Sequence, residues 1–197
     1  MNHILNKNLF LVKEHVGMFK AANNFDVFDP STSELLFNCR EEKLGFFTKL
    51  FRFTKYKTMT PIHLEIKTAD NQPVLSMKRG SSFFGFAPLT ILDENGATAG
   101  TLKRKFKLGG AKIEMNGSNG QLVYTLKGNF IGWDFKIYQN DRVVAEITKK
   151  WAGIGKELFT SADNYILNIY DTVAADDQGR ILMMAGVLCI DFLLKEN

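Results

Sequence analysis

Short stretches in which apolar and polar residues alternate recur along the chain, and turns rich in Asp, Asn and Gly separate them. Alternation with a period of two is typical of β-strands that bury one face, and these turn residues tolerate left-handed backbone angles. The expected hairpins span residues 10–19, 25–37, 62–77, 89–102, 113–126 and 135–147. The pattern predicts about twelve strands, which need two packed sheets or closure into a barrel.

The period changes at the C-terminus, where residues 180–195 read as about four helical turns with no polar stripe. A helix that is apolar on every face must be buried on every face, in protein or in lipid. The run from Ile181 to Leu194 has fourteen residues and contains Asp191, whereas a spanning helix needs about 18 uncharged residues. We therefore predict a helix that fills the lumen of the barrel, with membrane insertion as the alternative.

Composition limits the number of domains, the kinds of partner and the cellular compartment, but it does not identify a function. The 197 residues predict a single domain over 1–197, and 25 Lys plus Arg against 21 Asp plus Glu give a net charge of +4. This mild excess allows an anionic partner, and we expect no nucleic acid. Cys39 and Cys189 lie far apart in the sequence, so we expect no disulfide and a reducing compartment. The N-terminus has no secretory signal pattern, which favours a cytoplasmic location.

The segment 147–165 resembles the signature stretch of the phospholipid scramblases. It contains Trp151-Ala-Gly153, then Glu157-Leu-Phe-Thr160, then Ala162-Asp-Asn-Tyr165. The looser hairpin pattern upstream, including 132–138, is similar to both scramblases and LURP-one-related proteins. The resemblance implies the tubby-like fold, a mainly β structure in which a twelve-stranded antiparallel barrel surrounds one central hydrophobic C-terminal α-helix. It also implies association with membranes and anionic phospholipids, at the inner face of the membrane.

The same resemblance raises the question of calcium, because scramblases are proposed to bind it ahead of the terminal helix. The matching positions here are Asp163, Asn164, Asp171, Asp176 and Asp177, with altered spacing. Calcium takes six to eight oxygen ligands, of which these side chains could supply some. The alternative is that Asp176 and Asp177 place negative charge at the N-terminus of the helix. No other cofactor is expected.

Two groups of basic residues are candidates for contact with anionic headgroups. Residues 43–57 give a basic and an apolar half if helical, with Lys43, Lys49, Arg52, Lys55 and Lys57 as the cations. The alternatives are that its aromatics pack on the barrel, or that it forms a strand. Basic residues also end every second strand, among them Lys103, Arg104 and Lys105. They predict a positive rim, or alternatively protection of strand ends against edge pairing.

The sequence contains no recognisable catalytic motif. His3, His15 and His63 lie on separate expected elements, with no acidic-histidine cluster and no His/Cys pair at metal-ligand spacing. We therefore expect a non-enzymatic protein that binds anionic phospholipid membranes peripherally. The alternatives are a scramblase that moves lipids between leaflets, with or without calcium, and a soluble scaffold or nucleic-acid-associated module.

Overall fold

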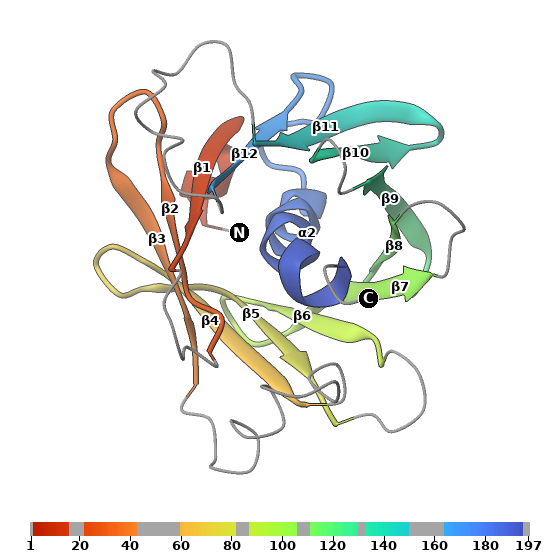
Figure 1. The fold of residues 1–197 in the computed structure, drawn as a ribbon, viewed down its shortest axis with the longest axis horizontal. Helices are drawn as coiled ribbons and strands as arrows, with labels where there is room; N and C mark the ends of the chain where they lie inside the picture. Colours follow the sequence, from red (N-terminus) through yellow and green to blue (C-terminus); the bar gives the residue numbers. More distant parts are fainter. Residues whose placement is uncertain are drawn as a thin grey trace.

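The structure, a computed structural model, describes residues 2–15, 22–42, 60–81, 87–105, 111–129, 133–149 and 164–194. Within these residues lie a short 3-10 helix, twelve strands and an α-helix (Figure 1). Their bounds are η1 (His3–Asn6), β1 (Leu9–Glu14), β2 (Phe25–Phe28), β3 (Leu35–Glu41), β4 (Ile62–Thr68), β5 (Pro73–Arg79), β6 (Leu89–Asp93), β7 (Thr98–Lys105), β8 (Ala111–Gly117), β9 (Leu122–Asn129), β10 (Asp134–Gln139), β11 (Arg142–Thr148), β12 (Asn164–Ile169) and α2 (Gly179–Leu194).

The twelve strands form a closed antiparallel barrel in which each strand pairs with its sequence neighbours and β1 pairs with β12. This confirms the predicted barrel, but two of its strands differ from the prediction. Leu11 on β1 lies opposite Phe28 on β2 and opposite Ile166 on β12, so the partners of β1 are β2 and β12. The predicted hairpin over 10–19 is therefore wrong. Its first half is a strand, but that strand pairs with β2 and β12, and residues 16–19 lie outside the described residues. The twelfth strand is β12, which the alternating pattern does not predict.

Alternation along the strands places apolar side chains inside the barrel and polar ones outside. On β4, Ile62, Leu64 and Ile66 are buried, whereas His63 and Glu65 between them are partly exposed. The turns adopt the left-handed backbone that their residues favour, with a φ of 80° at Gly96. The register of strand pairing therefore decides which outward-facing side chains become neighbours. The polar side chains that could bind a partner lie on this outer face.

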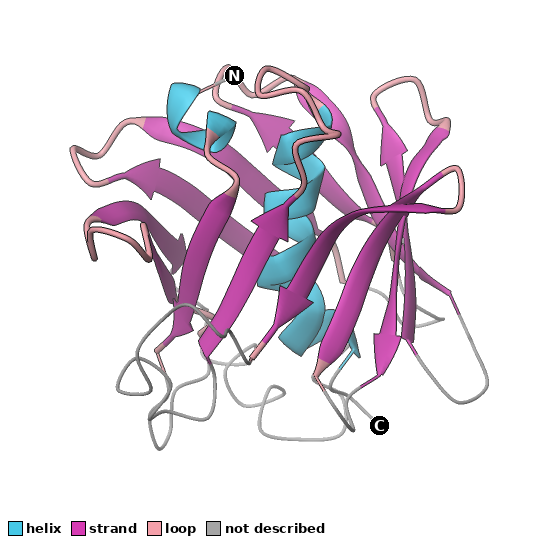
Figure 2. Cartoon of the chain, turned by 90° about the horizontal axis from the view of Figure 1, so that it is seen from above, coloured by secondary structure: helices cyan, strands magenta, loops and turns pink. Residues whose placement is uncertain are grey.

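Helix α2 runs through the barrel, and strands surround it on all sides (Figures 1 and 2). It contacts β6, β7, β8 and β12. Every residue from Ile181 to Ile190 is buried, which explains why the helix needs no polar stripe. At Gly100 on β7 a side chain would meet the backbone oxygen of Asn116 and approach Leu182 of the helix within 3.0 Å. The predicted lumen-filling helix is confirmed.

Odd-numbered strands all run in one direction, so their ends gather at one end of the barrel. Arg40, Lys78, Lys105 and Lys127 lie near that end, as the spacing of basic residues predicts. Their surroundings differ, since the Arg40 guanidinium binds Asp26 at 2.6 Å. Arg79 alternates onto the inner face, where it is buried and donates to the backbone oxygen of Thr60 at 3.2 Å.

Candidate functional site

A row of four lysines crosses the outer face of the barrel in direct cross-strand register. The row consists of Lys105 on β7, Lys112 on β8, Lys127 on β9 and Lys136 on β10. Neighbouring strands are about 4.8 Å apart, so this lysine row extends over about 14 Å. Like charges placed directly opposite one another destabilise an antiparallel pair. The row therefore needs negative charge close to it, from neighbouring side chains or from a ligand.

Acidic side chains flank the lysine row. Glu114 lies between the first two lysines, with oxygens 3.1 Å from Lys105 Nζ and 3.2 Å from Lys112 Nζ. Burial raises the pKa of Glu114, but the hydrogen bonds from these two lysines outweigh it and hold the pKa below its ordinary value. Asp134 lies 3.7 Å from Lys136, and Asp141 lies 4.0 Å from Lys127. Such partly exposed ion pairs are weak, so a phosphate can replace the carboxylate at small cost.

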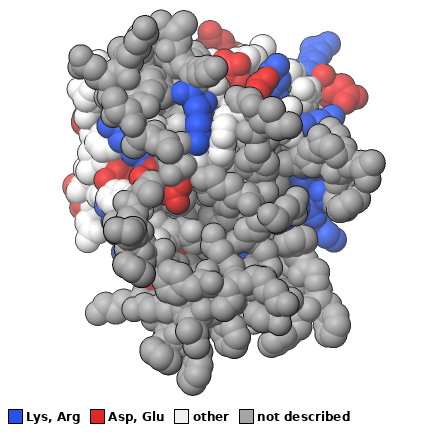
Figure 3. Space-filling model, in the orientation of Figure 1, with Lys and Arg blue, Asp and Glu red and all other residues white. Residues whose placement is uncertain are grey.

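The described charges in Figure 3 intermix, with Lys and Arg lying beside Asp and Glu along the upper margin of the face drawn there. The lysine row is therefore a local arrangement set by register, and it does not depend on a large excess of positive charge. This agrees with the net charge of only +4 for the chain.

A hollow of about 190 Å³ adjoins the lysine row on β9 and β10. Lys127, Tyr138 and Leu122 contribute to its lining. The Lys127 ammonium lies 4.6 Å from the centroid of the Tyr138 ring, and Leu122 is 56 % exposed, an unusual degree for a large apolar side chain. The hollow thus brings a cation, an aromatic ring and an apolar side chain to one place on the surface.

The three consecutive basic residues predicted at the end of β7, Lys103, Arg104 and Lys105, do not all point to the same face of the barrel. Lys103 is exposed on the outer face opposite Glu114, and Lys105 belongs to the lysine row. Arg104 alternates onto the inner face opposite the buried Ile113. The other predicted cations, Lys43, Lys49, Arg52, Lys55 and Lys57, lie outside the described residues.

The predicted calcium ligands are also dispersed. Asn164 begins β12 and is buried, whereas Asp171, Asp176 and Asp177 follow the opposite end of that strand. A strand of this length separates its two ends by about 16 Å. The Asp171 carboxylate accepts a hydrogen bond from Asn8 at 2.6 Å. Asp163 lies outside the described residues.

Asp177 takes the alternative role at the helix N-terminus. Its Oδ1 accepts a hydrogen bond from the backbone N–H of Gly179 at 2.6 Å, and its other oxygen accepts from the Tyr124 hydroxyl at 3.4 Å. A carboxylate in this position satisfies a free N–H group and complements the helix dipole. Asp177 lies two residues before α2, so its carboxylate contacts the helix N-terminus from outside the first turn.

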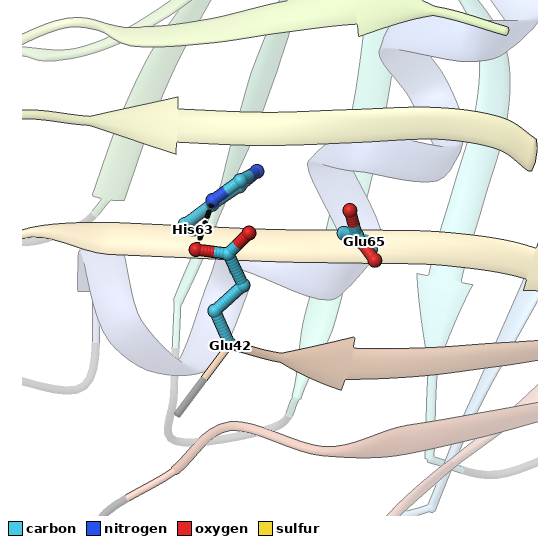
Figure 4. A group of neighbouring side chains, drawn as sticks. All are labelled: Glu42, His63 and Glu65. Carbon is cyan, nitrogen blue, oxygen red and sulfur yellow. Dashed lines mark ion pairs between the residues drawn. The ribbon is translucent and has the colours of Figure 1, made fainter. Parts of the chain in front are cut away.

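A second group of side chains corrects the expectation that no acidic-histidine cluster exists. One ligand atom from each of Glu42, His63 and Glu65 lies within 4.8 Å of the others (Figure 4). His63 Nδ1 is 2.7 Å from Glu42 Oε2. Sequence spacing does not reveal the cluster because Glu42, which follows the end of β3, and His63 on β4 lie far apart in the sequence, and the pairing of β3 with β4 brings them together. His63 and Glu65, two residues apart on an alternating strand, are the signal that points to a shared face.

Among the described residues, no helix is both long enough and apolar enough to cross a bilayer.

Comparison with known proteins identifies relatives along most of the chain. A family model described as LURP-one-related matches residues 8–191. The curated protein "Altered inheritance rate of mitochondria protein 25" of Saccharomyces cerevisiae is 20 % identical, over 96 % of this chain and 71 % of its own. An X-ray structure of a protein from Arabidopsis thaliana superposes with a TM-score of 0.56 at 12 % identity, covering 96 % of this chain and 94 % of the other. The last likeness concerns the fold alone.

Proposed function

The chain belongs to the LURP-one-related family, and from this premise we propose that it is a non-enzymatic protein that binds peripherally to membranes containing anionic phospholipids. The observation that carries the proposal is the lysine row over β7–β10. Each basic residue near an anionic leaflet contributes about 1 kcal/mol of attraction. Four lysines held at strand spacing can therefore contact several headgroup phosphates at once.

The position of the lysine row and the side chains beside it both support contact with a membrane surface. The barrel presents the four side chains on its outer surface over four neighbouring strands, and long lysine side chains can reach from there toward one anionic layer. Lys103 is exposed on the same face of β7 and adds a fifth cation. The hollow beside Lys127 and Tyr138 can receive one headgroup, while the exposed Leu122 can reach the apolar boundary. We place the contact at the cytoplasmic leaflet, which carries the anionic lipids.

The proposal does not extend to movement of lipids between leaflets. Such movement by α2 would require the helix to leave the barrel, and its vacated lumen would lose the contacts of every residue from Ile181 to Ile190. The buried position of α2 therefore favours attachment to the membrane over transport through it.

Co-sedimentation of the full chain with vesicles tests the proposal. Vesicles of neutral phosphatidylcholine and vesicles that also contain phosphatidylserine are compared at low and high salt, each with chelator and with added calcium. We expect binding only to the anionic vesicles, and loss of that binding at high salt because salt screens charges on exposed side chains. Equal binding to neutral vesicles would overturn the proposal, as would a requirement for added calcium.

A further inference from the structure

The Glu42, His63 and Glu65 cluster lies on the outer surface of β4 and beside the end of β3 (Figure 4). In the strand order, β5 and β6 separate β4 from the first strand of the lysine row. His63 and Glu65 alternate onto the outer face of β4. Glu42 follows the end of β3, and its backbone N–H donates to the His63 oxygen at 3.0 Å. The antiparallel pairing thus fixes the backbone positions of all three donors.

We propose that Glu42, His63 and Glu65 form a binding site for a divalent transition-metal ion of the zinc class. One imidazole nitrogen and two carboxylate oxygens are a donor set that zinc accepts, with water completing a tetrahedron. Calcium and magnesium prefer oxygen ligands alone, so the imidazole argues against them. Three protein ligands leave one position for an exogenous ligand.

The present distances need only small side-chain rotations to enclose an ion. Bonds of about 2.0–2.2 Å to a tetrahedral ion place the donors about 3.4 Å apart. The donor atoms now lie within 4.8 Å of one another, and His63 Nδ1 and Glu42 Oε2 are 2.7 Å apart. All three side chains are partly exposed, so they can rotate without disturbing the core.

The surrounding cations determine how strongly the site binds. Lys67 Nζ lies 2.8 Å from Glu65 Oε2, and this hydrogen bond lowers the pKa of Glu65, which keeps the ligand ionised. The same lysine competes with a metal ion for that carboxylate. Arg40 stands opposite Glu65 in the register, but its guanidinium is directed toward β2, where it binds Asp26 and the Phe25 oxygen.

Lys78 lies opposite His63 on β5, and it adds to the positive field around the cluster. Together, Lys67 and Lys78 predict a site of moderate affinity. They also give the proposal a specific consequence. Removing the Lys67 charge should tighten metal binding, whereas in a purely structural ion-pair cluster it would have no such effect.

Isothermal titration of zinc chloride into the full chain tests the site. We expect one zinc ion per chain, no heat with calcium chloride, and no measurable zinc binding by His63→Gln or Glu65→Gln. Lys67→Gln should lower the Kd by about two- to fivefold, the scale of an exposed ion pair. The matched control is His15→Gln, because His15 Nε2 lies 2.7 Å from Asp26 Oδ2 in a comparable histidine–carboxylate contact outside the cluster.

Circular dichroism melting of each variant separates lost binding from lost folding. If His63→Gln folds poorly, zinc binding by Glu65→Gln and Lys67→Gln tests the site independently. Absence of zinc binding by the wild-type chain would overturn the proposal. So would retention of binding in the folded His63→Gln variant, equal loss in His15→Gln, or weaker binding in Lys67→Gln.

Discussion

Arg180 Nη1 donates a hydrogen bond of 2.8 Å to the backbone oxygen of Lys7, which joins the first turn of α2 to the N-terminal segment of the chain. The guanidinium also donates to the Val173 oxygen at 2.9 Å and, through Nε, to the Ala174 oxygen at 2.7 Å. Arg180 is 1 % exposed. Its five N–H donors suit such a set of carbonyls, and they fix α2 where the helix enters the barrel.

Replacement of Arg180 by Met should lower the free energy of unfolding by about 3 kcal/mol or more. The variant leaves several buried carbonyls without a donor, and each costs about 1–3 kcal/mol. Arg180→Lys should recover only part of the loss, because an ammonium cannot reach all of the carbonyls. Urea unfolding followed by fluorescence measures the effect.

Arg142→Met is the matched control for this experiment, since Arg142 begins β11 and is exposed. Its unfolding free energy should stay within about 0.5 kcal/mol of the wild-type value. Equal stability of Arg180→Met and the wild type would show that Arg180 does not hold the helix in place.

Gly100→Ala should destabilise the protein by about 1–3 kcal/mol, the usual cost of overpacking. The added methyl group would meet the backbone oxygen of Asn116, which cannot rotate away, and would approach Leu182 of the helix. Thermal unfolding detects the change as a lower Tm.

Gly80→Ala serves as the comparison, because nothing lies within 4 Å of its added methyl group. Gly186→Ala should fall between the two, since its methyl group meets the flexible end of Met115. A Gly100→Ala variant as stable as Gly80→Ala would contradict the close approach of β7 to β8 and α2.

Asp29→Asn should lower the free energy of unfolding at neutral pH. Between neutral and acid pH, that free energy should then fall less than it does in the wild type. The hydrogen bond from Lys7, 2.7 Å long, holds the pKa of Asp29 below its ordinary value. A group whose pKa is lower in the folded state stabilises the protein above the unfolded pKa of about 4, and this contribution disappears as the pH falls through the folded pKa.

Urea midpoints between neutral pH and acid pH measure this dependence. The exposed Asp176 offers the control, and Asp176→Asn should follow the wild-type curve. An Asp29→Asn curve that also coincides with the wild-type curve would exclude the proposed contribution of the ion pair.

The strands that bury only one face were predictable from sequence, whereas β12 was not. Ile166 and Leu167 point to opposite faces of β12, yet both are buried. A strand buried on both faces shows no alternation, so a search for period-two patterns passes over it. Helix α2 was predictable for a related reason, because a helix without a polar face has to be enclosed.

The candidate sites depend on register, which the sequence pattern does not determine. The four lysines become neighbours only after three strand pairings are set, and the shift between Met115 and Asn116 in one of them alters the alignment along β8 and β9. Glu42 meets His63 for the same reason. Residue spacing along one strand finds neighbours on one face, but it does not find neighbours across strands.

Charge removal within and outside the lysine row tests the central claim most directly. The variant Lys112→Gln with Lys127→Gln removes two charges from the row, and Lys13→Gln with Lys78→Gln removes two charges from β1 and β5. We expect the row variant to bind phosphatidylserine vesicles about thirtyfold more weakly, because two charges contribute about 2 kcal/mol, and the control to keep most of the wild-type affinity.

Both variants should fold with wild-type stability, because relief of like-charge contacts offsets the lost ion pairs. The measurement is the bound fraction in co-sedimentation over a lipid titration at low salt. A larger loss for the row variant than for its control is the predicted result. Equal binding by the two variants would contradict the assignment of the lysine row as the membrane contact.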